Sequence, residues 1–231
     1  LKKTIDLILN IELSWFIAAI FLKFFACLII CLRYQKILSY KNLNTKFYFQ
    51  TKIYFEGIML TSLLPIGQVG IDLWRAKAIK KISDFSYLKI FNTLLSDRIS
   101  GLLAIIANST LASVGIYLFY PNIISITSNL KILTIPIFEL YILLCFILSL
   151  SSILAWLIFR YLKVIDFANM KLKKLIKYFD DALSPKLIIN TFFLSLINNI
   201  SVMTCFWFCA IAVGIDLPYS LMISLGLAII I

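Results

Sequence analysis

The chain has 231 residues, of which 62% are hydrophobic and 14% are charged, whereas soluble domains have about 45–50% apolar and about 25% charged residues. This excess is too large for the core of a water-soluble protein of this length and predicts an integral membrane protein. The net charge is +11, but the basic residues lie between apolar segments, so we expect no nucleic-acid partner. The sequence contains no histidine, which excludes Ser-His-Asp triads, histidine zinc sites and histidine general bases.

Several apolar segments are long enough to cross a membrane, which takes about 20 apolar residues in a helix. We predict spans near 13–32, 99–119, 132–159 and 187–213, and the start of a further span at 220–231. The fold class is therefore all-α and polytopic, and we interpret residues 1–231 as a single transmembrane domain. Because the chain begins with Leu1 and ends at Ile231 inside an apolar run, we expect it to be an excerpt from a longer protein.

The basic residues predict the orientation of the chain in the membrane. Segments 33–52 and 160–186 are rich in lysine and arginine, whereas the connections at 120–131 and 214–219 carry a single lysine between them. The positive-inside rule therefore places segments 33–52, 75–89 and 160–186 in the cytoplasm. We expect a multi-pass protein of the cell (inner) membrane.

Segment 53–73 does not fit a simple crossing of the membrane. It is long enough to span, but the basic segment 75–89 follows it directly and would then lie outside, against the positive-inside rule. The segment also contains residues that would break a continuous helix, namely Glu56, Gly57, Pro65, Gly67 and Gly70. We predict a re-entrant hairpin, with Pro65 and Gly57 in its gate. Irregular backbone at membrane depth is tolerated only beside protein or a watery cavity, so we expect a cavity here.

Two further segments are predicted to lie on the membrane surface. In segment 160–186, apolar residues recur at three- and four-residue steps with lysines on the opposite face, which is typical of an interfacial amphipathic helix. Residues 85–97 are predicted to form a second, shorter interfacial helix.

The residues most suggestive of a binding function lie between positions 56 and 98. Asp72 and Arg75 are three residues apart and share a helix face, whereas Asp97 and Arg98 are adjacent and must point in different directions. Crossed pairs, Asp72 with Arg98 and Asp97 with Arg75, would partner all four charges. Arginine also suits the bidentate capture of phosphate. The candidate substrate-binding residues are Arg75, Arg98, Asp72, Asp97, Glu56, Gly67 and Gly70. The alternative is that the charged residues are interfacial salt bridges that fix the hairpin.

Signs of enzyme chemistry are few in this sequence. It contains no G-x-x-x-x-G-K-[ST] nucleotide loop, and its one acidic pair, Asp180-Asp181, lies in a lysine-rich segment. We therefore expect no catalytic residues, no metal site and no cofactor, and we favour a protein that is not an enzyme.

The hairpin segment reads Leu63-Leu64-Pro65-x-Gly67, then Gly70-x-Asp72-x-x-Arg75. This pattern resembles the transmembrane domain of lysylphosphatidylglycerol synthases and the related flippase-like integral membrane proteins. The resemblance is carried by this run, which extends from Leu63 to Arg75. About twenty residues later Asp97-Arg98 opens an apolar helix, and Cys31-Leu32-Arg33-Tyr34 precedes the whole motif. The family implies movement of a phospholipid or lipid-linked sugar between leaflets.

Three functions remain open from the sequence. The first is a lipid flippase or transport domain, in which Arg75 and Arg98 hold a phosphate and Asp72 and Asp97 orient the two arginines or meet a cationic headgroup. The second is a membrane enzyme that acts on lipid-linked substrates. The third is a non-catalytic membrane partner of a glycosyltransferase or a lipid synthase. The expected ligand is an anionic phospholipid or a lipid-linked sugar.

Overall fold

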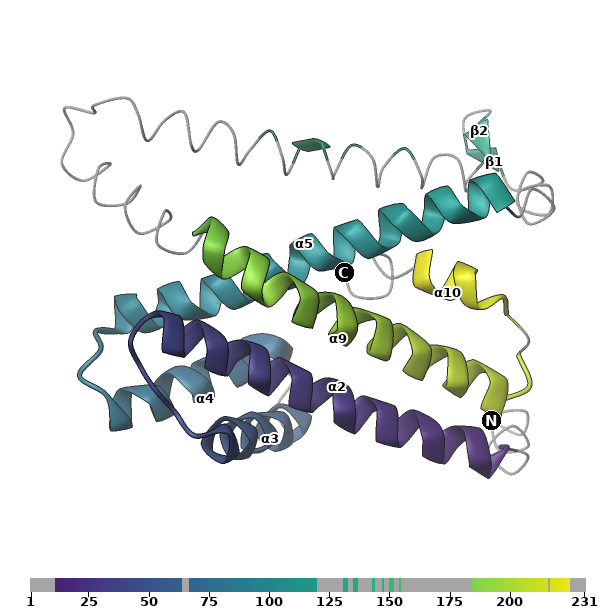
Figure 1. Ribbon diagram of the computed structural model, residues 1–231. Helices are drawn as coiled ribbons and strands as arrows, with labels where there is room; N and C mark the ends of the chain where they lie inside the picture. The colour runs from purple at the N-terminus through teal and green to yellow at the C-terminus, as the bar shows by residue number, and fades with distance from the viewer. Residues whose placement is uncertain are drawn as a thin grey trace. The chain divides into compact units, whose positions relative to one another are not determined.

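The computed structural model describes residues 11–63, 67–119, 131–132, 135–136, 143, 147, 150–151, 154, 184–215 and 217–224. The helices are α2 (Leu13–Tyr40), α3 (Phe47–Leu63), α4 (Gly67–Ile82), α5 (Tyr87–Phe119), α9 (Pro185–Ala212) and α10 (Tyr219–Ser224) (Figure 1). Two short strands, β1 (Lys131–Ile132) and β2 (Ile135–Pro136), pair antiparallel, with Ile132 opposite Ile135. The all-α class expected from the composition is confirmed.

Three helices are long and apolar enough to cross a membrane within the described ranges: α2, residues Tyr87–Gly115 of α5, and α9. The spans predicted near 13–32, 99–119 and 187–213 coincide with parts of these helices. Helix α2 exposes a series of large apolar side chains, including Phe16, Phe21 and Phe24, as a lipid-facing helix does. The spans predicted near 132–159 and 220–231, and the amphipathic segment 160–186, lie largely outside the described residues.

The chain divides into two compact units. The first, called the site unit below, comprises Cys27–Leu102 and Asp166–Ser195, and the second comprises Leu1–Ala26, Leu103–Ile165 and Leu196–Ile231. Helices α2, α5 and α9 each contribute residues to both units. In the second unit, Trp15 packs against Trp207 and Phe208, and the indole of Trp207 donates to the carbonyl of Leu217 at 2.8 Å.

Helix α2 continues well past the start of the predicted basic loop at position 33. It ends in a turn where Asn42 takes a positive φ of 65° and the amide of Leu43 donates to the carbonyl of Leu38 at 2.9 Å. These are the features of a Schellman motif, which closes a helix by bonding its last free carbonyls. Arg33 therefore belongs to a helix rather than to a loop, which corrects the first residues of the predicted segment 33–52.

The core of the site unit holds four helices together. Its buried apolar residues come from α2, α4, α5 and α9, and they are Tyr34, Ile37, Leu38, Ile79, Ile90, Leu94 and Leu187. A second cluster joins α2 to the hairpin through Cys27, Cys31, Tyr54 and Ile71. The two clusters therefore pack α2 against α4, α5, α9 and the hairpin within the site unit.

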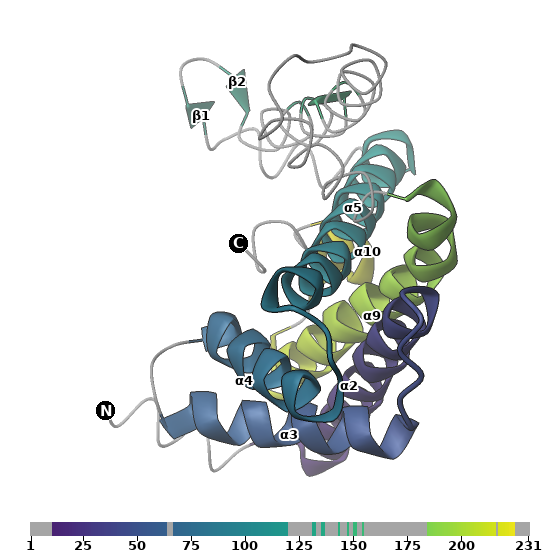
Figure 2. The ribbon, with the colours of Figure 1, turned by 90° about the vertical axis from the view of Figure 1, so that its left-hand side faces the viewer.

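Helices α3 and α4 form an antiparallel helical hairpin, and they lie side by side in both views (Figure 1, Figure 2). Gly57 lets them approach closely, since a Cβ there would meet the Cγ2 atom of Ile71 at 3.1 Å and its Cα at 3.3 Å. Gly67 begins α4 with a positive φ of 50°, a conformation that glycine adopts at little cost. Glu56, Gly57 and Gly70 lie inside helices, so the prediction that these three residues break the helix is wrong. Pro65 lies outside the described residues.

Residues 85–97 do not form a separate interfacial helix. Helix α5 begins at Tyr87 and continues to Phe119 without a break, and the hydroxyl oxygen of Ser86 caps it by accepting a hydrogen bond from the amide of Lys89 at 3.3 Å. Residues 87–100 contain neither proline nor glycine, so nothing in the sequence interrupts the helix before its apolar half. The continuity matters because it places Asp97 and Arg98 inside a long, rigid helix.

Candidate functional site

Asp97 is the centre of a cluster of five charged side chains, called the arginine–aspartate cluster below: Arg33, Asp72, Arg75, Asp97 and Arg98. Asp97 is 2% exposed. One carboxylate oxygen, Oδ1, accepts a hydrogen bond from Arg33 Nε at 2.7 Å, and the other, Oδ2, lies 3.5 Å from Arg75 Nη1. Arg33 also donates from Nη1 to the hydroxyl of Ser195 in α9 at 3.0 Å. One buried carboxylate is therefore shared by two arginines.

Arg75 is almost completely buried, at 1% exposed. Its guanidinium lies over the ring of Tyr34, 3.8 Å from the centroid, and 5.3 Å from the centroid of Tyr54, so that aromatic faces stabilise the cation. The hydroxyl of Tyr34 is engaged elsewhere, with Thr93 at 3.0 Å. Among the described residues, none of the three guanidinium nitrogens of Arg75 has a hydrogen-bond acceptor. Buried donors without acceptors are costly, so Arg75 has unused binding capacity.

Arg98 forms the accessible part of the cluster. It donates from Nε and Nη2 to the same oxygen of Asp72, Oδ2, at 2.9 and 2.6 Å. The side chain of Arg98 is 41% exposed and that of Asp72 is 20% exposed. The second carboxylate oxygen of Asp72 is buried and, among the described residues, accepts no hydrogen bond. This pair lies at the accessible edge of the cluster, and the Asp97 pair lies in its interior.

The geometry confirms both crossed pairs expected from the sequence. Asp72 and Arg75 lie on the same side of α4, while the adjacent Asp97 and Arg98 on α5 point in different directions. Each acid of one helix therefore meets the arginine of the other. The three arginines and two aspartates leave one positive charge, so an anion would neutralise the cluster.

Comparison with known proteins gives the family of the chain. The family model for the lysylphosphatidylglycerol synthase transmembrane region matches residues 1–231. The chain belongs to this family. It is also 29% identical over 113 residues to a UPF0104 membrane protein from Pyrococcus horikoshii, a match that covers 48% of this chain and 34% of that protein. The aligned region thus spans about a third of the relative's length. No solved structure matches the chain.

As a member of the lysylphosphatidylglycerol synthase transmembrane family, the chain is a multi-pass membrane protein whose family is named for the synthesis of a lipid. The described residues contain no group of three or more cysteine, aspartate and glutamate side chains that could hold a metal ion. The cluster itself is dominated by arginine, which binds phosphates and carboxylates rather than cations. Its residues suit anion binding.

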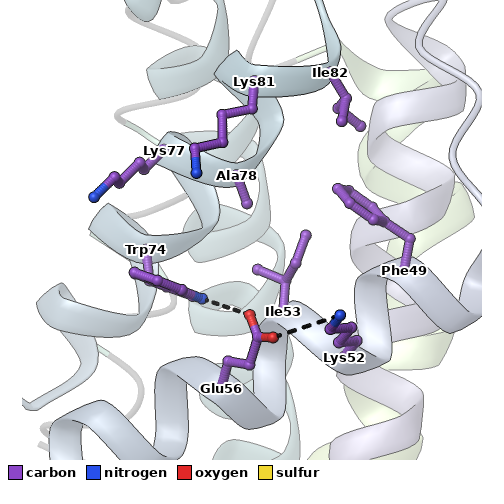
Figure 3. A pocket seen from close by; sticks show the side chains of 9 residues that line it. All are labelled: Phe49, Lys52, Ile53, Glu56, Trp74, Lys77, Ala78, Lys81 and Ile82. Carbon is purple, nitrogen blue, oxygen red and sulfur yellow. Dashed lines mark hydrogen bonds and ion pairs between the residues drawn. The ribbon is translucent and has the colours of Figure 1, made fainter.

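The other predicted binding residues lie apart from the charged atoms of the cluster. Glu56 accepts a hydrogen bond from the indole of Trp74 at 3.1 Å and lies 4.0 Å from the ammonium of Lys52 (Figure 3). Gly67 is exposed at the start of α4, and Gly70 is buried within that helix. That these residues bind substrate stays a prediction.

Sequence reasoning missed Arg33 because it treated that residue as the first basic residue of a loop. The signal that could have found it is that residues 33–40 contain neither proline nor glycine, so the helix of the preceding apolar run can continue past Arg33. Continuing the helix by two turns would have placed it among the buried residues.

Proposed function

We propose that this chain is a lipid-transport domain that moves an anionic phospholipid or a lipid-linked sugar between the two leaflets of the membrane. The proposal assigns phosphate binding to Arg75 and Arg98. It assigns to Asp72 and Asp97 the task of holding these arginines in place when no lipid is bound. The match to the lysylphosphatidylglycerol synthase transmembrane family supports a role in lipid metabolism or movement.

The observation that carries the proposal is the unsatisfied hydrogen-bonding capacity of the buried Arg75 side chain. Its guanidinium is buried, and its three nitrogens have no hydrogen-bond acceptors among the described residues. A phosphate offers several oxygens that accept charge-assisted hydrogen bonds, which are about twice as strong as neutral ones. A bound phosphate group would therefore satisfy guanidinium donors of Arg75 that have no hydrogen-bond acceptor among the described residues, and it would neutralise the excess positive charge of the cluster.

The two arginines differ in accessibility, which suggests the order in which they bind the phosphate of the lipid. Arg98 is 41% exposed and meets the ligand first, while Arg75 is enclosed by Tyr34 and Tyr54. Transfer from one to the other requires that the α3–α4 hairpin, which carries Tyr54 and Arg75, moves away from α2. We assign the hairpin the role of a re-entrant gate in the inner membrane, with the basic segments that flank it facing the cytoplasm.

The experiment measures lipid movement by the purified protein in liposomes. Fluorescent phospholipids are placed in both leaflets, and a membrane-impermeant quencher is added outside, so that transport exposes lipid that was protected inside. The variants are Arg98→Gln, which removes an accessible arginine, and Arg75→Lys, which keeps the charge but loses the planar fork. The control is Lys89→Gln, which removes an exposed charge from α5 outside the cluster.

We expect the wild type and Lys89→Gln to move lipid at similar rates. Both arginine variants should move it at least about tenfold more slowly, because lost hydrogen bonds to a charged group cost about 1.5–3 kcal/mol. Circular dichroism and size-exclusion chromatography establish that the variants are folded. If folded wild type moves neither phospholipids nor lipid-linked sugars, the transport proposal is wrong and the crossed pairs are scaffold.

A further inference from the structure

A cavity of about 220 Å³ lies between α3 and α4, separate from the charged atoms of the arginine–aspartate cluster (Figure 3). Its apolar wall includes Phe49, Ile53 and Ile82, and the indole of Trp74 closes one side. Ligand pockets for whole molecules usually measure about 300–1,000 Å³. This one is smaller than that range, so it has room for part of a lipid such as the headgroup and not for the acyl chains. We call it the hairpin pocket.

The charged residues of the hairpin pocket do not balance. Lys52 lies 4.0 Å from Glu56, four residues further along α3, so these two charges largely compensate each other. Lys77 and Lys81, four residues apart on α4, also line the pocket, and both are exposed. Neither has a carboxylate within ion-pair distance among the residues that the structure describes. The pocket therefore carries about two uncompensated positive charges on one helix.

The orientation of the side chains separates the pocket into two ends. Trp74 holds Glu56 by a hydrogen bond of 3.1 Å, and the ammonium of Lys77 lies 5.6 Å from the Trp74 ring centroid. In Figure 3, Lys81 extends along α4 above Trp74 and Lys77 points outward from that helix, while Glu56 and Lys52 lie together on α3 at the other end. An anion is attracted to the first end and is kept away from the carboxylate at the second.

We propose that the hairpin pocket binds the phosphate of an anionic phospholipid headgroup, with Lys77 and Lys81 as its ligands and the acyl chains outside. The chemistry favours a lipid over a free ion, because lysines beside an apolar wall match a phosphate attached to a hydrocarbon chain. The site is distinct from Arg75 and Arg98, and binding there does not depend on transport. Its test is therefore independent of the transport proposal.

The experiment counts bound lipids on the purified protein by native mass spectrometry during a titration with phosphatidylglycerol. The double variant Lys77→Gln/Lys81→Gln removes two charges from the pocket. The matched control, Lys46→Gln/Lys89→Gln, removes two exposed charges that do not line it. A third variant, Glu56→Gln, removes the carboxylate and leaves Lys52 without its partner. Separate titrations use phosphatidylcholine and inorganic phosphate as probes.

We expect the pocket variant to bind phosphatidylglycerol about tenfold more weakly and the control to differ from wild type by less than about twofold. Glu56→Gln should bind more tightly, since it raises the positive charge of the pocket. Equal weakening in both double variants would mean general surface attraction and would overturn the proposal. So would displacement of the lipid by an equal concentration of inorganic phosphate, which would identify the site as one for free anions.

A second measurement places the lipid without relying on charge variants. Phosphatidylglycerol with brominated acyl chains quenches tryptophan fluorescence at short range, and Trp74 is the tryptophan that lines the hairpin pocket. The quenched fraction should fall in Trp74→Phe, which keeps an aromatic side chain there. Unchanged quenching would show that the lipid binds elsewhere.

Discussion

The shared carboxylate of Asp97 makes this residue the one on which the arginine–aspartate cluster depends. It partners Arg33 at 2.7 Å and Arg75 at 3.5 Å, and all three side chains are buried. Removing one partner of a buried ion pair leaves uncompensated charge in a poorly solvated site. Asp72 occupies a different position, because its partner Arg98 is 41% exposed and water can solvate the arginine when the carboxylate is absent.

We therefore predict unequal effects of the two Asp→Asn substitutions on stability. Asp97→Asn should lower the free energy of unfolding by about 3–5 kcal/mol, whereas Asp72→Asn should lower it by no more than about 1 kcal/mol. Thermal unfolding of the detergent-solubilised protein, followed by size-exclusion chromatography after heating, compares the two. An Asp72→Asn variant that is as unstable as Asp97→Asn would contradict this ranking.

At this scale the sequence predicted the pairs but not the whole cluster. The spacing of Asp72 and Arg75, and the adjacency of Asp97 and Arg98, are sufficient to derive the crossed pairs because helix geometry fixes which neighbours share a face. Arg33 and Ser195 were not derivable in that way. They are brought to the cluster by α2 and α9, and contacts between helices far apart in the sequence follow from packing rather than from local spacing.

Among the helices, α5 packs closely against α2 beside the arginine–aspartate cluster, and this contact limits the movement of Arg33. A Cβ atom at Gly101 would meet Arg33 Nη1 at 3.2 Å, and that guanidinium is already fixed by Asp97 and Ser195. Arg33 therefore cannot move away without loss of a hydrogen bond. Gly115, in the same helix, has no described atom within 4 Å of such a Cβ.

These two glycines provide a matched pair of substitutions. Gly101→Ala should destabilise the protein by about 1–3 kcal/mol through overpacking, while Gly115→Ala should stabilise it by about 0.5–1 kcal/mol because alanine favours helix. The same unfolding assay, at one detergent concentration, measures both changes. If Gly101→Ala is also stabilising, the contact between α5 and Arg33 is looser than the distances indicate.

The helices show where sequence patterns succeed and where they do not. The apolar runs located α2, α5 and α9 because length and hydropathy are local properties. The boundaries of α2 and α5 were misjudged, since the basic residues that begin at Arg33 and the polar residues 85–97 look like surface segments. Residues 33–40 and 87–97 are helical because no proline or glycine interrupts them. Polar side chains among them, including Arg33, Gln35, Tyr40 and Asp97, have partners in the site unit.

For the whole molecule, the main question is how the α3–α4 hairpin meets the membrane. Helix α3 has 17 residues and α4 has 16, which at about 1.5 Å per residue gives lengths of about 25 and 24 Å. A hydrocarbon core is about 30 Å thick. Both helices are thus short for a full crossing, which agrees with the proposed re-entrant position. The composition predicted that the chain is a membrane protein, but it carries no information about how deeply the α3–α4 hairpin enters the membrane.

We predict the accessibility of three single cysteines, introduced one at a time into a cysteine-free background. Asn44→Cys, before α3, and Asp84→Cys, after α4, should both react with a membrane-impermeant maleimide from the cytoplasmic side only. Ser62→Cys, near the tip of the hairpin, should not react from the outside. Labelling in intact cells and in inverted vesicles measures this, and outside labelling of Ser62→Cys would mean that the hairpin crosses the membrane completely.

The single excess charge of the arginine–aspartate cluster also has an electrical consequence for the proposed transport. A phosphodiester carries one negative charge, so the loaded cluster is neutral and the transmembrane voltage does no net work on it. The empty cluster keeps its positive charge, on which the voltage acts with about 2.3 kcal/mol per 100 mV for a full crossing. The voltage therefore acts on the step in which the site returns empty, and a complete cycle carries one negative charge across the membrane. A cell interior that is negative thus favours outward movement of the lipid.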